Sequence, residues 1–386
     1  MPKKNATALF GGSFNPPTLA HLSVIKGLSD RFEKVIVMPA KISPFKIGAD
    51  KICDKDRLSL LKECCLSMKN VEVSDFELKN EGVSYTYITV SQLKKTHENL
   101  FLVMGTDNIE GLHGWKNIDK ILNECTVYFV PRPGFPVTES DEKTLSSLNC
   151  RYEIADFIGA DGSSTLVPVA NAFGKLREVV PENVAGFIER NRLYEQYFFI
   201  RDLYEKYSVK KSRVEHTYGV VKAAIILAGI YGADVKKAIL ASLLHDCGKY
   251  VTVMELEQKG FRFDDEAKHA LPPVEHCYTS EAIARYDLRI TDEEVLRAIR
   301  LHTTGDENMT TLDKIVFCAD YVEEGRTTPG VEPIRQKILV DLDGAMLDIL
   351  NATVNYLKSK NAEIDKRTLA CRDRLEKTIR KGEQKC

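Results

Sequence analysis

The sequence predicts two domains of different fold class: an α/β domain with a parallel sheet over residues 1–194 and an all-α domain over residues 195–386. Three observations lead to this prediction. At 386 residues the chain is long enough for two hydrophobic cores. In the first half, β-rich runs alternate with amphipathic ones. From about residue 196 the strand signals stop and only helical spacing remains.

Alternating segments define the elements of the first half. Helices are expected over residues 19–32 and 56–68, where apolar residues recur with helical spacing. Strand–helix alternation of this kind gives parallel strands covered by helices on both faces. Ligands on such sheets bind beyond the carboxyl ends of the strands. The expected strands are residues 7–10, 34–40, 71–78, 100–105 and 126–132.

The second half contains segments with helical spacing only, and several of them begin after Thr or Asp, as capped helices do. We therefore expect an all-α bundle. The segments are EHTYGVVKAAIILAGIYG, DVKKAILASLLHDCG, TSEAIARYDL, DEEVLRAIRLH, TLDKIVFCADYVEEG and LVDLDGAMLDILNATVNYLKS.

Composition narrows the class of protein. Apolar content of 44%, charged content of 28% and a net charge of −2 are ordinary for a globular protein and give no basic surface for nucleic-acid binding. The 10 cysteines form no CxxC pair and are expected to be reduced, small apolar residues. The N-terminal apolar run ATALF is too short for a signal peptide, and no run approaches the ~20 apolar residues of a membrane span. A cytoplasmic protein without membrane contact is expected.

One strand-to-helix junction of the first half is a candidate phosphate site. The segment LFGGSFNPPTLAHL (residues 9–22) reads as a strand, a tight turn and the start of a helix. Gly11 and Gly12 let a phosphate approach the backbone, and the free N–H groups at the helix start point toward it. Thr18 and His21 lie on one face of the first helical turn. Alone the pattern is weakly specific, because turns without ligands look similar.

The first half as a whole resembles the nucleotidyltransferases that carry His or Thr, two residues, then His, and more narrowly nicotinate-mononucleotide adenylyltransferase. The resemblance covers nearly all of residues 6–194 and implies a Rossmann-like nucleotidyltransferase fold. It implies that a mononucleotide phosphate attacks the α-phosphorus of ATP, which enters with Mg²⁺, and that pyrophosphate leaves. Positioning and charge stabilisation drive such a reaction. The matching segments are SPFK (43–46), DRLSLL (56–61), SDFELKNEGVSYT (74–86), VMGTDNIEGLHGW (103–115), VYFVPRPGF (127–135) and VVPENVAGFIERNRLY (179–194).

The same resemblance implies roles for individual residues. Thr18 and His21 would hydrogen-bond the ATP phosphates, and Lys46 would neutralise the triphosphate. Thr86 and Trp115 would hold the pyridine ring, since the flat ring of the only tryptophan suits stacking on a heteroaromatic; the alternative for Trp115 is a core residue that anchors its loop. Further nucleotide or substrate contacts are implied for Gly11, Gly12, Ser13, Phe14, Gly105, Asp107, Arg132, Ser163 and Thr165.

Two positions depart from the family pattern. Asn15 stands where many members carry Asp. In DGSSTLVP (161–168), Ser163 and Thr165 fit, but Pro168 occupies the position of an arginine that clamps the ATP phosphates. Proline cannot replace the paired donors of a guanidinium. The first half is therefore expected either to transfer adenylyl groups or only to bind and sense a nucleotide.

The second half carries a candidate metal site. Imidazole and carboxylate ligands suit Fe, Mn or Zn, and six of them exceed what one tetrahedral zinc uses. Each candidate lies on or at the end of a predicted helix, and helices of one bundle can direct such residues at a common centre. One histidine alone is more often a core or surface residue, but the adjacent His–Asp pair favours a site. The candidate ligands are His216, His245, Asp246, His276, His302 and Asp320.

This arrangement resembles the HD-domain phosphohydrolases, named after the His–Asp doublet. Residues 302–335 are similar to the symmetrical diadenosine tetraphosphate hydrolase type, and the match covers about residues 196–375. The resemblance implies an HD-domain helical bundle with a two-metal centre that activates the attacking water. Iron is favoured, with Mn or Zn as alternatives. Asp246 would bridge the ions, and Lys249 and Arg326 would pair with phosphate.

Together these observations predict a bifunctional enzyme. One half would make nicotinate adenine dinucleotide from ATP and nicotinate mononucleotide, and the other would split dinucleoside polyphosphates such as diadenosine tetraphosphate into two ADP. One alternative makes the first half a nucleotide-sensing module. Another gives the second half a different phosphate ester, such as a cyclic nucleotide or a deoxynucleoside triphosphate. Formation of a homo-oligomer is left open.

Overall fold

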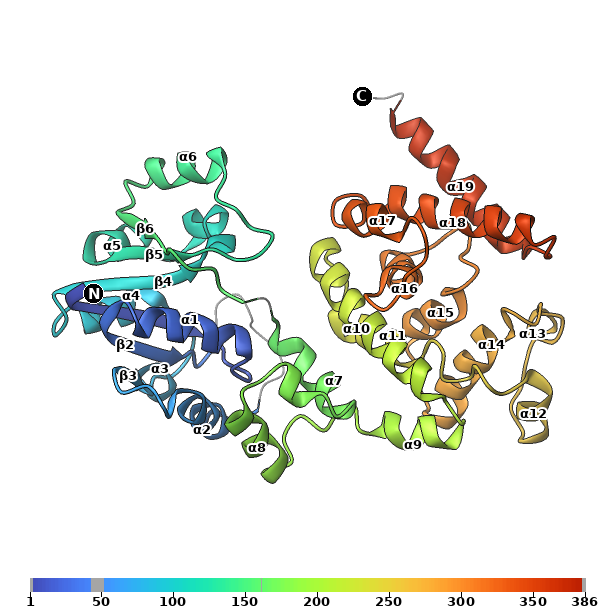
Figure 1. Cartoon of the computed structure of the whole chain (residues 1–386), viewed down its shortest axis with the longest axis horizontal. Helices are drawn as coiled ribbons and strands as arrows, with labels where there is room; N and C mark the ends of the chain where they lie inside the picture. Colours follow the sequence, from blue (N-terminus) through green and yellow to red (C-terminus); the bar gives the residue numbers. More distant parts are fainter. Residues whose placement is uncertain (1–2, 43–51, 161, 384–386) are drawn as a thin grey trace. The chain divides into compact units, whose positions relative to one another are not determined.

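The computed structural model describes residues 3–42, 52–160 and 162–383, and it divides the chain into two compact units, Met1–Glu195 and Gln196–Cys386 (Figure 1). The first unit is a parallel sheet with helices on both faces, and the second consists of helices. Both fold classes are as predicted.

The sheet of the first unit places the central strands β1 and β4 side by side, and the chain continues outward from them in both directions. The order is β3-β2-β1-β4-β5-β6 and all pairings are parallel. Such a reversal of strand order opens a crevice at the carboxyl ends of the central strands, where ligands bind. The strands are β1 (Lys3–Gly12), β2 (Phe32–Pro39), β3 (Val71–Val73), β4 (Asn99–Gly105), β5 (Thr126–Val130) and β6 (Tyr152–Ile154).

Two hydrophobic cores cover the two faces of this sheet. Successive strand residues point to opposite faces, so Ala8 and Val35 pack with α1, α2 and α8, whereas Leu9 and Ile36 pack with α4 and α5. The helices are α1 (Leu19–Ser29), α2 (Asp54–Cys65), α3 (Phe76–Lys79), α4 (Thr86–Leu93), α5 (Ile118–Glu124), α6 (Glu139–Ser147), α7 (Val167–Ala172) and α8 (Glu182–Arg190).

The third expected strand, residues 71–78, is longer than the observed strand β3. Strand β3 ends at Val73, and a hydrogen bond from the Phe76 amide to Ser74 Oγ starts the short helix α3. The edge strand β6 was not predicted. Its three residues are partly or fully exposed, so it lacks the apolar alternation by which strands are recognised.

Within the described part of the second unit every regular element is a helix. Side-chain caps fix several helix starts: the Asp234 carboxylate accepts amide hydrogens at the start of α11, and Thr310 forms a capping box with Asp313 at α16. The helices are α9 (Phe199–Lys206), α10 (Lys211–Tyr231), α11 (Val235–Leu244), α12 (Val253–Gln258), α13 (Asp265–Lys268), α14 (Glu275–Ala282), α15 (Glu293–Leu301), α16 (Thr311–Val322), α17 (Val331–Lys337), α18 (Leu342–Ser359) and α19 (Lys366–Glu383).

Helices α10, α11, α15 and α16 pack on one another, and α14 packs on α15. This packing matters for function because α10, α14 and α16 contain candidate ligands and α11 and α15 end at them. None of the helices in the described ranges combines the length and the apolar run needed to cross a bilayer.

Candidate functional site

A cavity of about 410 Å³ in the first unit gathers most of the expected nucleotide-binding residues. It lies where β1 and β4 end, at the crevice that the strand order predicts. Glycine at the end of β4 leaves room there, because a Cβ on Gly105 would lie 2.2 Å from Asp107 Oδ1. The lining includes the expected residues Gly11, Gly12, His21, Thr86, Gly105, Asp107, Trp115 and Arg132.

The start of α1 fixes the imidazole that faces this cavity. Thr18 is the N-cap, and its Oγ1 lies 2.8 Å from His21 Nδ1, while the Thr18 amide donates to the same nitrogen at 3.0 Å. The buried Phe14 ring packs against His21 with 5.0 Å between ring centroids. The cap thus fixes the orientation of the imidazole that lines the cavity.

Buried Arg57 holds the turn between β1 and α1 from the side away from the cavity. Its side chain is 1% exposed and donates to the Ser13 carbonyl at 2.7 Å and to Asp54 at 2.5 Å. The Tyr194 hydroxyl donates to Asn15 Oδ1 at 2.9 Å. Asn15, which stands where many family members carry Asp, therefore still offers an oxygen that anchors the turn. Arg57 was not predicted, because Asp54 is its neighbour in α2 but the Ser13 carbonyl lies 44 positions away in the chain.

Several predicted residues are placed elsewhere. Thr18 and Phe14 are buried beside His21, and Ser13 offers its carbonyl to Arg57. Ser163 caps a short turn through the Thr165 amide, and Thr165 is exposed. These residues do not line the cavity. Lys46 lies outside the described residues.

Pro168 is the second residue of helix α7 and is buried there. Amides in the first turn of a helix have no partner within the helix, so proline costs no helical hydrogen bond at this position. The basic side chains nearest to it in sequence are engaged on the surface: Lys175 contacts Glu178 at 3.2 Å, and Arg177 pairs with two glutamates, Glu182 and Glu189. The described cations that line the cavity are Lys116 and Arg132.

In the second unit the six predicted metal ligands converge on one buried centre. His216 lies in α10, Asp320 in α16 and His276 in α14, whereas His245 and His302 are the residues at which α11 and α15 end. Each of these two helices is partly exposed at its start and buried toward the end that meets the ligand. The apolar helix of residues 235–244 therefore leads directly into the centre, which explains the abrupt change to His245–Asp246 in the sequence.

Asp246 is the common member of two ligand groups. Its Oδ1 lies 3.2 Å from His276 Nε2 and 3.6 Å from His302 Nε2. Its Oδ2 lies 3.5 Å from His245 Nε2. On that side Asp320 Oδ1 lies 2.8 Å from His216 Nε2 and 3.9 Å from His245 Nε2. One carboxylate oxygen thus faces each group, as a bridging ligand requires.

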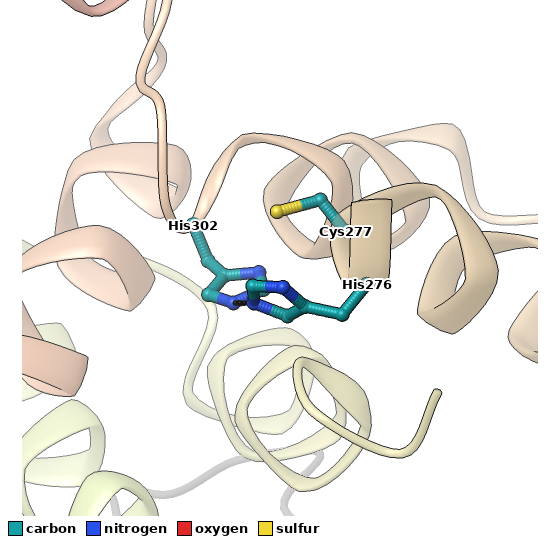
Figure 2. A group of neighbouring side chains, drawn as sticks. All are labelled: His276, Cys277 and His302. Atoms are coloured by element: carbon teal, nitrogen blue, oxygen red, sulfur yellow. Dashed lines mark hydrogen bonds between the residues drawn. The ribbon is translucent and has the colours of Figure 1, made fainter. Parts of the chain in front are cut away.

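Figure 2 shows the group formed by His276, His302 and Cys277, whose potential ligand atoms all lie within 4.8 Å of one another. The two imidazoles meet at their Nε2 atoms, 3.1 Å apart. Sequence reasoning treated every cysteine as a small apolar residue and did not anticipate Cys277 here. Since both Nε2 atoms face Asp246 Oδ1, the carboxylate side of the pair is the better metal position.

Backbone carbonyls orient two of the imidazoles. His245 Nδ1 lies 2.6 Å from the Ser242 carbonyl and His302 Nδ1 lies 2.7 Å from the Ile299 carbonyl, each three residues earlier. A carbonyl only accepts hydrogen bonds, so each Nδ1 carries a hydrogen. Each Nε2 is then the nitrogen directed at the centre, which is the arrangement that metal-ligating histidines need.

Orphaned buried atoms test whether the residues fit a metal. His216 Nε2, His245 Nε2 and Asp246 Oδ1 are buried and make no hydrogen bond of acceptable geometry in the described structure, although Asp320 Oδ1 lies 2.8 Å from His216 Nε2 and His276 Nε2 lies 3.2 Å from Asp246 Oδ1. Buried polar atoms are almost always paired, and exceptions point to a bound ion or water. These three atoms belong to the predicted ligand set and point into the centre, so the donors fit a divalent cation.

The electrostatics also suit a cation. Burial opposes ionisation of Asp246, but the charges of His245 and His302 outweigh it and lower the pKa of its carboxyl well below the usual range. Burial, together with the charge of His302, lowers the pKa of His276, and burial lowers that of His245. Burial also opposes protonation of His216 and His302, but contacts with Asp320 and Glu323 raise the pKa of His216, and contacts with Cys277 and Asp246 raise that of His302. The ionised Asp246 carboxylate and the neutral imidazoles of His245 and His276 are in the protonation states that bind metals.

Three cations surround the centre. Arg213 contacts Asp246 Oδ2 at 2.8 Å, and Lys249 Nζ lies 2.8 Å from His276 Nε2 and 3.5 Å from Asp246 Oδ1. Arg326 contacts Asp320 Oδ1 at 3.0 Å. All three side chains are partly exposed. The site can therefore attract a polyphosphate as well as hold metal. Arg213 was not predicted.

Removing the ammonium group of Lys249 is expected to slow phosphate-ester hydrolysis. If the ammonium group stabilises negative charge that develops on the phosphate, Lys249→Ala removes ~2–4 kcal/mol of transition-state stabilisation. The value of kcat should then fall about 30- to 1,000-fold. Steady-state kinetics measure this, with Lys259→Ala, a nearby exposed lysine, as the control. A change of less than about threefold at unchanged metal content would assign Lys249 a structural role.

Comparisons with known proteins give relatives for both units. The cytidylyltransferase-like family model matches residues 9–153, and the HD domain model matches residues 213–325. A symmetrical bis(5′-nucleosyl)-tetraphosphatase of Halalkalibacterium halodurans is 41% identical over 172 residues, 42% of this chain and 88% of that protein. A probable nicotinate-nucleotide adenylyltransferase of Clostridium botulinum is 33% identical over 198 residues, 48% of this chain and 98% of that protein.

A third relative is similar along both units. A probable nicotinate-nucleotide adenylyltransferase/Ap4A hydrolase of Mycoplasma genitalium is 26% identical over 332 residues, which are 84% of this chain and 89% of that protein. The order of the two parts in this chain is therefore shared with another fused protein.

Proposed function

The chain joins a member of the nicotinate-nucleotide adenylyltransferase family to a member of the symmetrical bis(5′-nucleosyl)-tetraphosphatase family, and we propose that it carries out both reactions. It is an enzyme of the nucleotidyltransferase and HD phosphohydrolase classes. The first half would form nicotinate adenine dinucleotide, and the second would cleave diadenosine tetraphosphate symmetrically. The observation that carries the proposal for the second half is the pair of ligand groups on the two oxygens of Asp246.

In the first unit the cavity provides positions for both substrates. ATP, entering as its Mg²⁺ complex, would place its phosphates at Gly11, Gly12 and His21, where backbone N–H groups and an imidazole edge converge. Thr86 and Trp115 line the same cavity and would hold the pyridine ring. An oxygen of the mononucleotide phosphate then attacks the α-phosphorus, and the bond to pyrophosphate breaks. His21, held by Thr18, would donate a hydrogen bond to the phosphate as charge shifts to the leaving group.

In the second unit His216, His245, Asp246 and Asp320 would hold one divalent ion, and Asp246, His276 and His302 a second. Fe is favoured, with Mn or Zn as alternatives. When bound, the ions supply an activated water and neutralise phosphate charge. Lys249 and Arg326 would bind the phosphate oxygens on either side of the bond that breaks. Water attacks an inner phosphorus, and ADP leaves as the bond to the bridging oxygen breaks.

Analysis of the products tests the proposal for the second half. The purified chain, loaded with Mn²⁺ or Fe²⁺, is expected to convert diadenosine tetraphosphate into ADP alone. ATP plus AMP would contradict symmetrical cleavage. Faster hydrolysis of a cyclic nucleotide or a deoxynucleoside triphosphate would contradict the substrate assignment and leave the metal centre in place.

Pro168 favours a second candidate function for the first half, a module that binds and senses a nucleotide. The group that clamps phosphate in relatives would act most strongly as charge moves, so its absence affects turnover more than binding. If the first half only senses a nucleotide, nucleotides would quench the fluorescence of Trp115, the only tryptophan, while formation of nicotinate adenine dinucleotide from ATP and nicotinate mononucleotide would be weak or absent. Robust formation of dinucleotide and pyrophosphate would exclude the sensing alternative. Lys116 or Arg132, which line the cavity, would then have to replace the missing arginine.

A further inference from the structure

Among the side chains that surround the metal centre, one buried carboxylate has no role in the reaction described above. Glu323 is 5% exposed and follows helix α16 directly, where the backbone turns away from the helix. Its Oε1 lies 3.1 Å from His216 Nδ1, and its Oε2 accepts the Gly325 amide hydrogen at 2.6 Å. Both carboxylate oxygens are thus engaged, one by a backbone amide and one by a predicted metal ligand.

The contact fixes which nitrogen of His216 is available. An ionised carboxylate only accepts hydrogen bonds, so Nδ1 carries the hydrogen that Glu323 accepts. The lone pair of His216 then lies on Nε2, the atom that is buried, makes no hydrogen bond of acceptable geometry and lies 2.8 Å from Asp320 Oδ1. Backbone carbonyls do the same for His245 and His302. His216, which lies within α10, uses a carboxylate from a different helix instead.

Gly219 makes room for this carboxylate. It lies three residues after His216 on the same face of α10. A Cβ at this position would lie 2.5 Å from Glu323 Oε2 and 3.3 Å from Glu323 Cβ and Cδ. Any other residue would displace the carboxylate, so a glycine inside a 21-residue helix, where it is otherwise unfavourable, has a specific function.

We infer that Glu323 is a positioning residue of the metal centre: it orients the His216 imidazole toward the ion shared with His245, Asp246 and Asp320, and Gly219 provides the space that it occupies. The inference rests on the proposed metal centre. It assigns Glu323 to only one of the two ligand groups, because His276 and His302 lie on the other oxygen of Asp246. Loss of Glu323 should therefore lower the affinity of one metal site and leave that of the other site unchanged.

Titration with Mn²⁺ tests this directly. The full chain is freed of metal with a chelator, and the electron paramagnetic resonance signal of free aqueous Mn²⁺ is followed as the ion is added. The wild type is expected to bind two ions per chain. In Glu323→Leu one site is expected to weaken by about 10- to 100-fold and the other to change little. Gly219→Ala should weaken the same site, and combining it with Glu323→Leu should add little.

Two further variants separate positioning from other roles. In Glu323→Gln the amide oxygen can still accept the Nδ1 hydrogen, while the amino group replaces the acceptor of the Gly325 amide, so this variant should retain more affinity than Glu323→Leu but less than the wild type. The matched control is Glu324→Leu, which removes the neighbouring carboxylate, 65% exposed and paired with Lys222 at 2.7 Å. It should bind both ions like the wild type.

The outcomes are distinct. Two ions bound by Glu323→Leu with wild-type affinity would overturn the inference and leave the metal centre intact. Equal losses in Glu323→Gln and Glu323→Leu would also overturn it, because a side chain that can accept the Nδ1 hydrogen would then bind metal no better than one that cannot. Failure of the wild type to bind Mn²⁺ would contradict the proposed metal centre as well.

Discussion

Asp246→Ala is expected to abolish hydrolysis of diadenosine tetraphosphate. The variant loses the one carboxylate that faces both ligand groups, through Oδ1 toward His276 and His302 and through Oδ2 toward His245. The variant should lose the several kcal/mol by which the metal ions stabilise the transition state of hydrolysis, so kcat should fall by about 10³-fold or more. Release of ADP by the metal-loaded full chain measures the effect.

Two controls accompany the Asp246 variant. Asp343→Ala removes a carboxylate of the same unit that only pairs with Lys314 near the surface, and its hydrolysis should match the wild type. Quenching of Trp115 fluorescence by nucleotide should survive in Asp246→Ala, because that cavity belongs to the other unit. Hydrolysis by Asp246→Ala within about tenfold of the wild-type rate would exclude a bridging role for this carboxylate.

Arg57→Met should destabilise the first unit more than any surface substitution. The variant leaves the Ser13 carbonyl without its donor and separates Asp54 from a guanidinium that is 1% exposed. Asp54 keeps its ion pair with Lys41 at 2.6 Å, so the main loss is the buried donor to the Ser13 carbonyl. Leaving that acceptor unsatisfied lowers the free energy of unfolding by ~1–3 kcal/mol. Urea unfolding followed by the fluorescence of Trp115, the only tryptophan, reports on this unit selectively.

The matched control for Arg57 is Arg192→Met. Arg192 also forms an ion pair, with Glu195 at 3.0 Å, but its side chain is 81% exposed. An exposed pair contributes at most ~1 kcal/mol, so this variant should unfold close to the wild type. If Arg57→Met behaved like Arg192→Met, the turn that carries Gly11 and Gly12 would not depend on the buried guanidinium.

The sequence was sufficient to predict the elements whose signal is local. The adjacent pair His245–Asp246 at the end of an apolar helix indicated the metal centre, and the Gly11–Gly12 turn before Thr18 and His21 indicated the phosphate site. Helical spacing and capping residues mark such helix ends within a few positions of the chain. The fold class of each unit followed from the same local patterns.

The residues that the prediction missed act through distant parts of the chain. Glu323 and His216 are 107 positions apart, and Arg57 and Ser13 are 44 apart. In the sequence Glu323 is one of two adjacent glutamates, and only the packing of α16 against α10 buries it while leaving Glu324 exposed. The edge strand β6 was missed because a partly exposed three-residue strand needs no apolar alternation.

Metal removal tests the central claim, that the residues around Asp246 form a metal-dependent phosphohydrolase centre. The full chain, treated with chelator and dialysed, is assayed with diadenosine tetraphosphate before and after Mn²⁺ or Fe²⁺ is restored. We expect no ADP from the metal-free chain and recovery of hydrolysis as two ions per chain are added. Undiminished hydrolysis by protein that elemental analysis shows to be free of transition metal would contradict it.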